Sequence, residues 1–329
     1  MADAPDLSVV LTGRNDNYGG DFTTRLIRTL RFNWEALRDR GVSCEVVFVE
    51  WNPVSGRPPL LEILRDSLPE IAPARLRGYI VDRGYHVAFT LNPKLEYLEY
   101  VAKNVGVRRA RGRMVLATNA DVFMSRGVVD ALAGGGLEHR VVYRAARIDL
   151  ALGSDQSRVT WETLDDSRAH ARRPVLTPPL YAGGAGDFLL LDRESWHTLR
   201  GFNEVYRAAR VGIDRNFLVK AYGCGYRICD MGCPVYHVNH PGSYSTSRPV
   251  VQDAAAETAW GKWQWAYNTV VYDNPDGWGL RNAPEKELRE GAVHLDFDWK
   301  GVPPVVDLRR VVLPLRRVAT ASDGAEAPR

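Results

Sequence analysis

The sequence has few cysteines and no long apolar run, and each absence excludes a class of protein. Four cysteines in 329 residues are too few for a disulfide framework, so we expect free thiols and a reducing compartment. No apolar run approaches the roughly 20 residues that cross a bilayer. The first six residues, Met1–Asp6, lack the basic and apolar regions of a signal peptide. These absences predict a cytoplasmic protein with no integral membrane segment.

Charge of one sign is not in excess either. The chain has 43 basic and 40 acidic residues and a net charge of +3, whereas nucleic-acid-binding proteins concentrate basic charge on one face. We therefore expect no nucleic-acid partner. Apolar residues make up 45% and charged residues 25% of the chain, which is typical of a folded globular protein.

Short apolar runs predict strands, and apolar residues at helical spacing between them predict helices. Up to residue 120, the expected strands are 7–12, 44–51, 77–81 and 114–118, and the expected helices are 22–37, 60–68 and 97–109. Further along, the expected strands are 141–148, 188–191 and 226–235, and the expected helices are 128–132, 193–198 and 212–222. Residues 154–179 show no pattern and are expected to be irregular. This alternation predicts an α/β fold with a mainly parallel sheet flanked by helices.

The tripeptide Asn119-Ala120-Asp121 follows the strand expected at 114–118. In open α/β sheets, ligands bind outside the carboxyl ends of the strands. A carboxylate and a carboxamide at this edge supply the oxygen ligands that hard divalent cations prefer. An aspartate that ends a strand is more often a turn residue, so the surrounding sequence has to decide between the two interpretations.

The segment before this tripeptide, Lys103–Gly112 (KNVGVRRARG), supports the metal site. It resembles the GT-A glycosyltransferases, especially family 2 and its metal-dependent relatives, in which a helix with the pattern N-x-G-x-x-x-A-x-G precedes a strand ending in D-x-D. Asn104 matches the start of that pattern, and Asn119 replaces the first carboxylate of D-x-D. The resemblance covers residues 7–240. It implies a GT-A (Rossmann-like) fold that binds a nucleotide-diphosphate sugar at Asn104, Asn119 and Asp121, with Mn²⁺ or Mg²⁺ on Asp121.

The resemblance also implies positions for the nucleotide. The first strand and its loop contain Thr12 and Arg14, which would line the uridine or phosphate side. Glu50 ends the second strand, where the family has an acidic residue that contacts the base or ribose. The alternative for Arg14 and Glu50 is a solvated loop pair. UDP- and GDP-sugars are the leading donors.

Two further segments resemble the acceptor side of the family. A glycine-rich turn ends at Asp187, which can bond an acceptor hydroxyl or cap the turn. Asp214 stands where inverting members carry their general base, although Ile213 replaces the preceding glutamate. The alternative for Asp214 is a helix N-cap. In that case a retaining enzyme is the alternative mechanism.

Histidines after the last expected strand complete the expected metal site. Several metal-dependent GT-A families place a second metal ligand there, so the resemblance implies His237 and His240 as candidate ligands. Only one of them need reach the ion if the segment is extended, and we favour His237 over His240. The cysteines 224, 229 and 233 are an alternative zinc site, but their spacing lacks paired C-x2-C motifs. Thiols around a buried strand are the simpler interpretation.

The resemblance divides the chain into a GT-A domain at 1–245, a C-terminal extension at 246–318 and a disordered tail at 319–329. The nucleotide-sugar half of the domain covers about 1–125, and the acceptor half covers 126–245. Aromatic residues of the extension are expected to stack on a sugar or to fill the core: Trp260, Trp263, Trp265 and Tyr267. The acceptor is open between a small molecule and a lipid-linked or envelope glycan, and a homodimer is also left open.

Three rival functions remain to be weighed. A nucleotidyltransferase needs a lysine in its glycine-rich loop, and residues 13–20 have none. A dehydrogenase needs G-x-G-x-x-G after the first strand, which is absent. A catalytically inactive sugar- or nucleotide-binding protein stays open because fold does not fix function.

Overall fold

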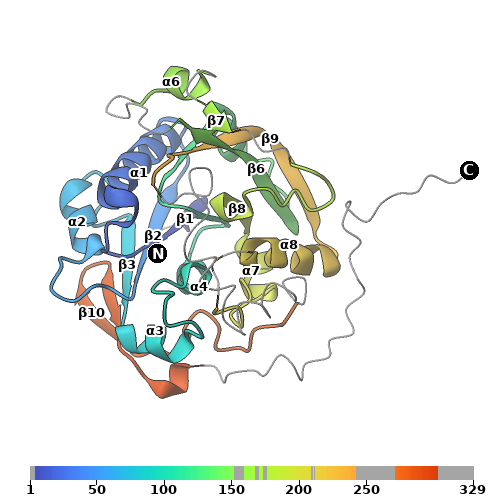
Figure 1. The fold of residues 1–329 in the computed structure, drawn as a ribbon. Coiled ribbons are helices and arrows are strands. Elements are labelled where there is room, and N and C mark those ends of the chain that lie inside the picture. The colour runs from blue at the N-terminus through green and yellow to red at the C-terminus, as the bar shows by residue number, and fades with distance from the viewer. Residues whose placement is uncertain are drawn as a thin grey trace, which may run out of the picture.

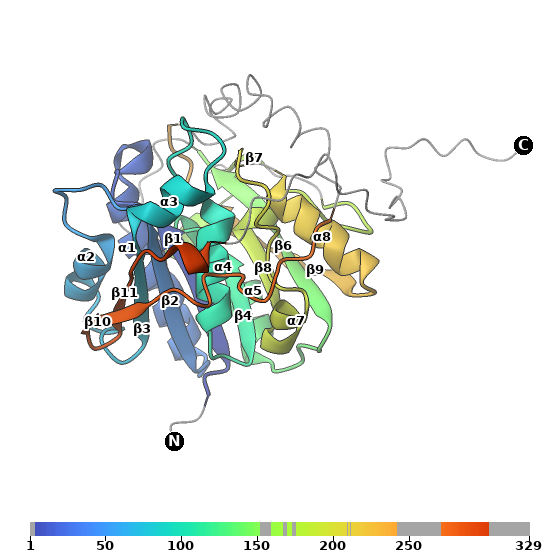
Figure 2. The same ribbon diagram turned by 90° about the horizontal axis from the view of Figure 1, so that it is seen from below.

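The computed structural model describes residues 4–151, 159–166, 170–172, 176–208, 210, 212–241 and 271–302. These residues form one mixed sheet with helices on both of its faces (Figures 1 and 2). The strands are β1 (Leu7–Gly13), β2 (Cys44–Trp51), β3 (Leu76–Val81), β4 (Met114–Thr118), β5 (Val122–Met124), β6 (Val141–Leu150), β7 (His170–Arg172), β8 (Phe188–Asp192), β9 (Arg227–His237), β10 (Glu285–Arg289) and β11 (Ala292–Leu295). The α-helices are α1 (Phe22–Asp39), α2 (Leu60–Ser67), α3 (Arg83–Phe89), α4 (Glu99–Arg109), α5 (Arg126–Ala133), α6 (Trp161–Asp165), α7 (Arg193–Thr198) and α8 (Ile213–Gly223).

The strand order is β10-β11-β3-β2-β1-β4-β8-β6-β9-β5, and β7 pairs with β6. Neighbouring strands are parallel from β11 to β4 and again between β6 and β9. Antiparallel pairs occur at β8 and at the outer strands β5, β7 and β10. The expected α/β fold with a mainly parallel sheet is confirmed.

Successive side chains of the central strands point to opposite faces of the sheet and pack into two separate hydrophobic cores. Val10 and Val47 belong to one core, which also contains residues of α4, α7 and α8. Val9 and Phe48 belong to the other core, which contains residues of α1, α2 and α5. Because both faces are covered, β1 and β2 are buried along their whole length.

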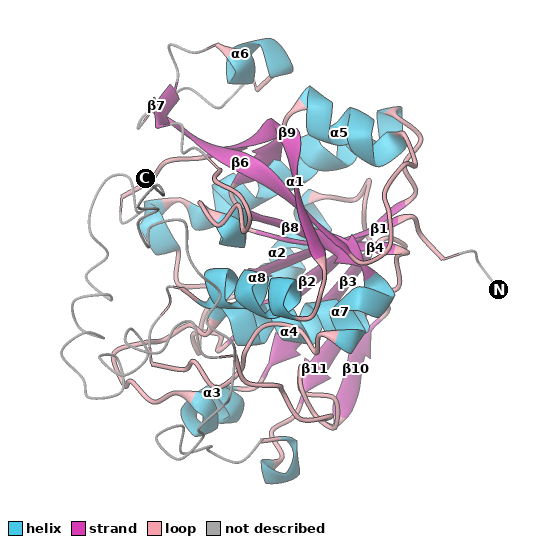
Figure 3. Ribbon diagram, turned by 90° about the vertical axis from the view of Figure 1, so that its right-hand side faces the viewer, coloured by secondary structure: helices cyan, strands magenta, loops and turns pink. Residues whose placement is uncertain are grey.

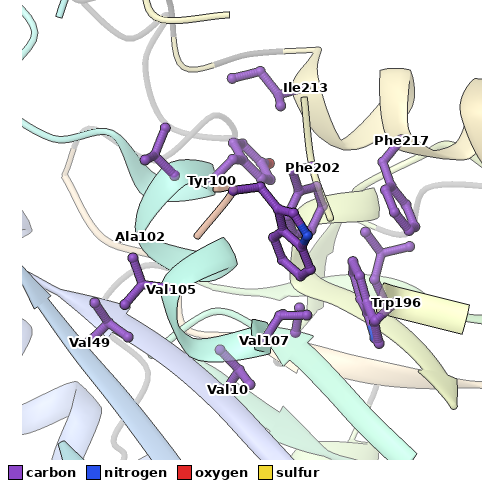
Figure 4. Close-up of a cluster of buried hydrophobic side chains, with 14 of the residues drawn as sticks. Val10, Val49, Tyr100, Ala102, Val105, Val107, Trp196, Phe202, Ile213 and Phe217 are labelled. Carbon is purple, nitrogen blue, oxygen red and sulfur yellow. The ribbon is translucent and has the colours of Figure 1, made fainter. Parts of the chain in front are cut away.

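The helix α4 lies directly on the sheet in the first of these cores. Figure 4 shows Val10 and Val49 of the sheet close to Val105 and Val107 of α4. A Cβ atom built on Gly106 would lie 2.5 Å from a methyl carbon of Val10, so only glycine permits this approach. This contact accounts for the glycine in the N-x-G pattern of the helix.

The described part of the C-terminal extension is joined to the sheet. β11 pairs in parallel with β3, so this segment lengthens the sheet at the edge occupied by β3. The side chains of Trp278 and Leu280 are buried in the same core as α4. Arg109 of α4 donates hydrogen bonds to the carbonyl oxygens of residues 279 and 280. The four aromatic residues proposed to contact a sugar (260, 263, 265 and 267) lie outside the described residues.

Several elements were not expected from the sequence. They are α3, β5, β10 and β11, together with α6 and β7 in the region expected to be irregular. Figure 3 shows α6 and β7 beyond the ends of β6 and β9, at one side of the molecule. Among the described helices, none combines the length and apolar character that crossing a membrane requires. The four cysteines are free thiols, and within the described residues they form no group suited to a metal.

Candidate functional site

Asp121, His237 and His240 come together at the carboxyl edge of the sheet. The Nε2 atom of His237 lies 3.7 Å from Asp121 Oδ1, and the Nε2 atom of His240 lies 3.3 Å from Asp121 Oδ2. The three side chains are 7%, 4% and 4% exposed, respectively. Within the described part of the chain, they are the one group of histidine, cysteine and acidic side chains with ligand atoms close enough to share a metal ion. Both candidate histidines therefore lie at the site, and these distances do not favour His237 over His240.

Sheet register places Asp121 beside His237. β5 begins one residue after Asp121 and runs antiparallel to β9, with Val122 opposite His237. The backbone N–H of Val238 donates to the carbonyl oxygen of Asp121 over 2.9 Å. Because β9 ends at His237, the chain is free to turn and bring His240 to the same carboxylate. The short strand β5, which the sequence did not predict, is thus the element that assembles the site.

Helix α1 holds the same segment from the other side. Thr29 Oγ1 donates to the carbonyl oxygen of Ala120 over 2.5 Å. Asn33 donates to the carbonyl oxygen of Val122 and accepts from the N–H of Met124, both over 2.8 Å. Thr29 and Asn33 are four residues apart and so lie on one face of the helix. They fix the backbone on both sides of Asp121.

Each histidine ring is oriented by its other nitrogen. The Nδ1 atom of His237 lies 2.9 Å from Asp149 Oδ1, and the Nδ1 atom of His240 lies 3.0 Å from the carbonyl oxygen of Pro241. An oxygen acceptor at Nδ1 holds a ring proton there. The other nitrogen, Nε2, faces Asp121: it donates to the carboxylate when the ring is protonated and offers its lone pair to an ion when the ring is neutral. Histidines that bind metal ions in proteins are held in the same way.

The charges around Asp121 keep its carboxylate ionised. Burial acts to raise the pKa of Asp121, but His237, His240 and Arg25 outweigh burial and hold that pKa well below its usual range. Arg25 is buried, with its Nε 3.7 Å from Asp121 Oδ2. Burial also lowers the pKa of the Arg25 guanidinium. An ionised carboxylate is the form that binds a metal ion.

Asn119 does not face the ligand atoms of this cluster but joins two other charged side chains. Its Oδ1 accepts from Lys103 Nζ over 2.6 Å, and its Nδ2 donates to Asp187 Oδ1 over 2.8 Å. Arg147 donates to the second oxygen of Asp187 over 3.0 Å. An amide can accept from a lysine and donate to a carboxylate at one position, whereas an ionised carboxylate can only accept. These two contacts account for an asparagine, and not an aspartate, at position 119.

The buried carboxylate of Asp187 is thereby engaged on both oxygens. Its side chain is 2% exposed, and its carbonyl oxygen accepts from Thr118 Oγ1 over 2.6 Å. In this arrangement Asp187 fastens the end of the glycine-rich turn to β4. Its expected bond to an acceptor hydroxyl therefore stays a prediction.

The glycine-rich turn before Asp187 is held by Arg144, a fully buried residue of β6 that the sequence analysis missed. Its guanidinium donates to four backbone carbonyl groups, those of residues 181, 183, 185 and 188. Burial lowers the pKa of Arg144 to about 10. Arg144 lies among apolar residues in the first half of the strand expected at 141–148, and this position was its only sequence signal.

Asp214 lies beside the same turn. Its Oδ2 accepts from the backbone N–H of Gly186 over 2.8 Å. The N-cap of α8 is Gly212, so Asp214 sits within the first turn and the N-cap alternative is wrong. Burial raises the pKa of Asp214, although backbone N–H groups and Arg144 oppose the shift. The residue as a whole is partly exposed.

Thr12 and Arg14 lie at the carboxyl end of β1, as expected. The hydroxyl of Tyr97 donates to Thr12 Oγ1 over 2.5 Å. Arg14 donates to the backbone carbonyl of Asn52 over 2.8 Å and to the carboxylate of Glu96 over 2.5 Å. Both expected residues are nearly buried, at 6% and 7% exposure.

Glu50 and Asn104 have positions that serve the fold. Both are completely buried. The two oxygens of Glu50 accept from the first backbone N–H groups of α2, at residues 60 and 61, over 3.0 and 3.2 Å. Asn104 donates to the carbonyl oxygen of Phe202 and to the carboxylate of Glu204. Their expected contacts with the nucleotide stay predictions, and we leave both residues out of the site proposed below.

Fold and site together define an α/β protein with a candidate divalent-metal centre at the carboxyl edge of its sheet. No family model matches the chain, and no curated protein matches it. The chain is similar to the solved structure of GalNAc-T7 with UDP, GalNAc and Mn²⁺, at 15% identity and a TM-score of 0.47 over 80% of this chain. The chain spans 50% of that structure.

Two further solved structures are similar to a comparable degree. The catalytic domain of Drosophila β1,4-galactosyltransferase 7 in complex with xylobiose has 13% identity and a TM-score of 0.46, covering 90% of this chain and 97% of that chain. TarS 1–349 of S. aureus in complex with UDP-GlcNAc has 15% identity and a TM-score of 0.45, covering 84% and 70%. At these scores the similarity does not assign a function. The function proposed below therefore rests on the residues of the candidate site.

Proposed function

We propose that this protein is a metal-dependent glycosyltransferase that moves a sugar from a nucleotide-diphosphate sugar to an acceptor hydroxyl. The observation that carries the proposal is the convergence of Asp121, His237 and His240 at the carboxyl edge of the sheet, with both Nε2 atoms directed at the carboxylate. The helix-and-strand pattern that resembles GT-A enzymes leads directly into Asp121. The sequence pattern suggests a nucleotide-diphosphate sugar as the donor substrate, and the geometry of the three side chains supports a metal site.

The donor set suits a first-row divalent ion. Asp121, His237 and His240 would hold Mn²⁺ or Mg²⁺, and two imidazoles with one carboxylate favour Mn²⁺ because Mg²⁺ prefers oxygen ligands. When bound, the ion would neutralise charge on the leaving diphosphate. Three protein ligands leave coordination positions for phosphate oxygens.

Asp214 is the proposed general base for an inverting transfer. Its raised pKa makes the carboxylate a better proton acceptor than an exposed aspartate, and its partly exposed position allows contact with a hydroxyl group. The backbone at Gly186, whose N–H donates to Asp214, lies close to Tyr100. A Cβ atom at Gly186 would lie 2.5 Å from the hydroxyl of Tyr100, so this approach requires glycine. Retention of configuration is the alternative, and the anomeric configuration of the product decides between them.

The remaining chain is assigned accordingly. We place the nucleotide near Thr12 and Arg14 at the end of β1, within a catalytic domain covering residues 1–245. The described part of the extension belongs structurally to that domain, because β11 pairs with β3. The acceptor stays open between a small molecule and a lipid-linked or envelope glycan.

A donor-hydrolysis assay tests the proposal without knowledge of the acceptor. The chain is incubated with UDP- and GDP-sugars and Mn²⁺, and release of the nucleoside diphosphate is measured with and without a panel of sugar acceptors. We expect release with one nucleotide only, abolished by EDTA and by Asp121→Ala. Binding of a nucleotide with no release from any sugar would identify an inactive binding protein and contradict the proposal.

A further inference from the structure

The hydrogen bonds of His237 continue beyond the candidate metal centre. Its Nδ1 lies 2.9 Å from Asp149 Oδ1, and Arg147 donates to that same oxygen over 2.7 Å from Nε and approaches it to 2.6 Å through a terminal nitrogen. The other terminal nitrogen of Arg147 donates to Asp187 over 3.0 Å. One continuous chain of polar contacts therefore links His237 to Asp187, at the end of the glycine-rich turn.

We propose that Asp149 is a positioning residue for the metal centre, a role that rests on the function proposed above. Asp149 holds the ring of His237 with Nε2 toward the ion. Through Arg147 and Asp187 it also fixes the centre relative to the glycine-rich turn, on the side where Asp214 lies. Asp149 acts through His237 and is not itself a ligand.

Sheet register makes this contact rigid. Asp149 and His237 are direct partners in the parallel pair of β6 and β9, near the carboxyl ends of both strands. The two side chains are 1% and 4% exposed. Water is therefore excluded from this contact and does not readily take the place of either group. An imidazole without a fixed acceptor at Nδ1 can rotate or change tautomer, and either change removes the lone pair from the ion.

Pairing with Arg147 explains why this carboxylate supports the centre without joining it. The guanidinium lies against Asp149 and Asp187 together, so neither carboxylate presents an uncompensated charge to a cation. Among the arginine and lysine side chains that the structure describes, none lies as close to Asp121, since Arg25 Nε is 3.7 Å away. Asp121 and Asp149 thus have different roles at the centre, and their different contacts with arginine side chains distinguish the two roles.

The experiment is a titration of the full chain with Mn²⁺, in the presence and absence of UDP, followed by electron paramagnetic resonance of the free ion. The variants are Asp149→Ala, Asp149→Asn and His237→Ala. A matched control is Asp192→Ala, which removes another buried aspartate (2% exposed) that caps α7. Circular dichroism and the melting temperature of each variant report on folding.

Loss of an outer-shell partner typically weakens metal binding by about 10- to 100-fold. We expect this loss for Asp149→Ala, a change of a few-fold at most for Asp149→Asn, whose amide oxygen still accepts from Nδ1, and no change for the control. A role in stability alone would lower the melting temperature in Asp149→Ala and in the control while leaving both Mn²⁺ affinities intact. Equal weakening by the Asn and Ala variants would also overturn the positioning role.

A second measurement does not depend on whether the Asp149→Ala variant folds. In a ¹⁵N-histidine spectrum of the wild-type chain, assigned with His237→Gln, the inference requires the proton of His237 on Nδ1. A neutral ring with its proton on Nε2 and none on Nδ1 would overturn it. Failure of the proposed function looks different, because the wild-type chain itself would then bind no Mn²⁺ with or without UDP.

Discussion

Asn119→Asp restores the acidic residue of the D-x-D pattern, and the structure predicts that it destabilises the protein. The amide of Asn119 accepts from Lys103 Nζ over 2.6 Å and donates to Asp187 Oδ1 over 2.8 Å. A carboxylate keeps the first contact and strengthens it. It turns the second contact into a repulsion between two carboxylates.

The magnitude follows from these two distances. At an effective dielectric constant of about 20, charges this close interact by roughly 6 kcal/mol. The new repulsion from Asp187 and the new attraction to Lys103 are then of similar size and nearly cancel. What remains is the lost hydrogen bond to a charged group, about 1.5–3 kcal/mol. We expect the free energy of unfolding to fall by about 2 kcal/mol.

Urea unfolding at neutral pH measures the change, and a reciprocal exchange provides the control. In the double variant Asn119→Asp/Asp187→Asn, the introduced amide donates to the introduced carboxylate and its oxygen accepts from Arg147, so every partner is again satisfied. We expect the double variant to recover to within about 1 kcal/mol of the wild type. A neutral Asn119→Asp variant, or a double variant as unstable as the sum of the single variants, would refute the reasoning.

Three further predictions concern other buried groups. Burial raises the pKa of Glu50 to about 7 from its ordinary 4.5, so its contribution to stability is complete below pH 4.5 and lost as the pH rises through 7. In urea unfolding, the difference between wild type and Glu50→Gln should therefore fall by about 3 kcal/mol over that range, and a pH-independent difference would contradict the shift. Arg144→Met leaves several buried carbonyl groups without a donor and should cost about 3 kcal/mol or more in the same assay; a loss below about 1 kcal/mol would show that the turn is held by other contacts. Asp214→Asn should lower turnover by about 10²- to 10⁴-fold with unchanged nucleotide binding in calorimetry, and full turnover would remove Asp214 as the base.

The sheet could be predicted largely from sequence because its central strands carry unbroken apolar runs. β2 occupies the expected residues 44–51, and α2 begins at the expected Leu60. The outer strands could not be predicted in the same way. β10 is exposed along its whole length and contains four charged residues among five, so only its pairing with β11 defines it. β5 is three residues long and is likewise defined by its partner strand.

The sequence predicted the positions of those candidate-site residues that lie at the ends of predicted strands. Asp121, His237 and His240 were the expected metal residues, and the structure brings the three side chains together. The contacts that hold them were not predictable, because Asp149, Arg147 and Arg144 reach the site through cross-strand register. Glu50 also lies at the expected strand end, and its side chain turns inward to the N-terminus of α2, a contact that the sequence did not indicate.

Metal-dependent nucleotide binding tests the central claim most directly. Calorimetric titrations of UDP and GDP are made with Mn²⁺ and with EDTA, on the wild-type chain and on Asp121→Ala and His237→Ala. The account predicts that one nucleotide binds in the presence of Mn²⁺, and that EDTA or either substitution weakens binding at least about tenfold, which corresponds to about 1.4 kcal/mol. Nucleotide binding that is indifferent to the ion and to both substitutions, or no nucleotide binding at all, would contradict it.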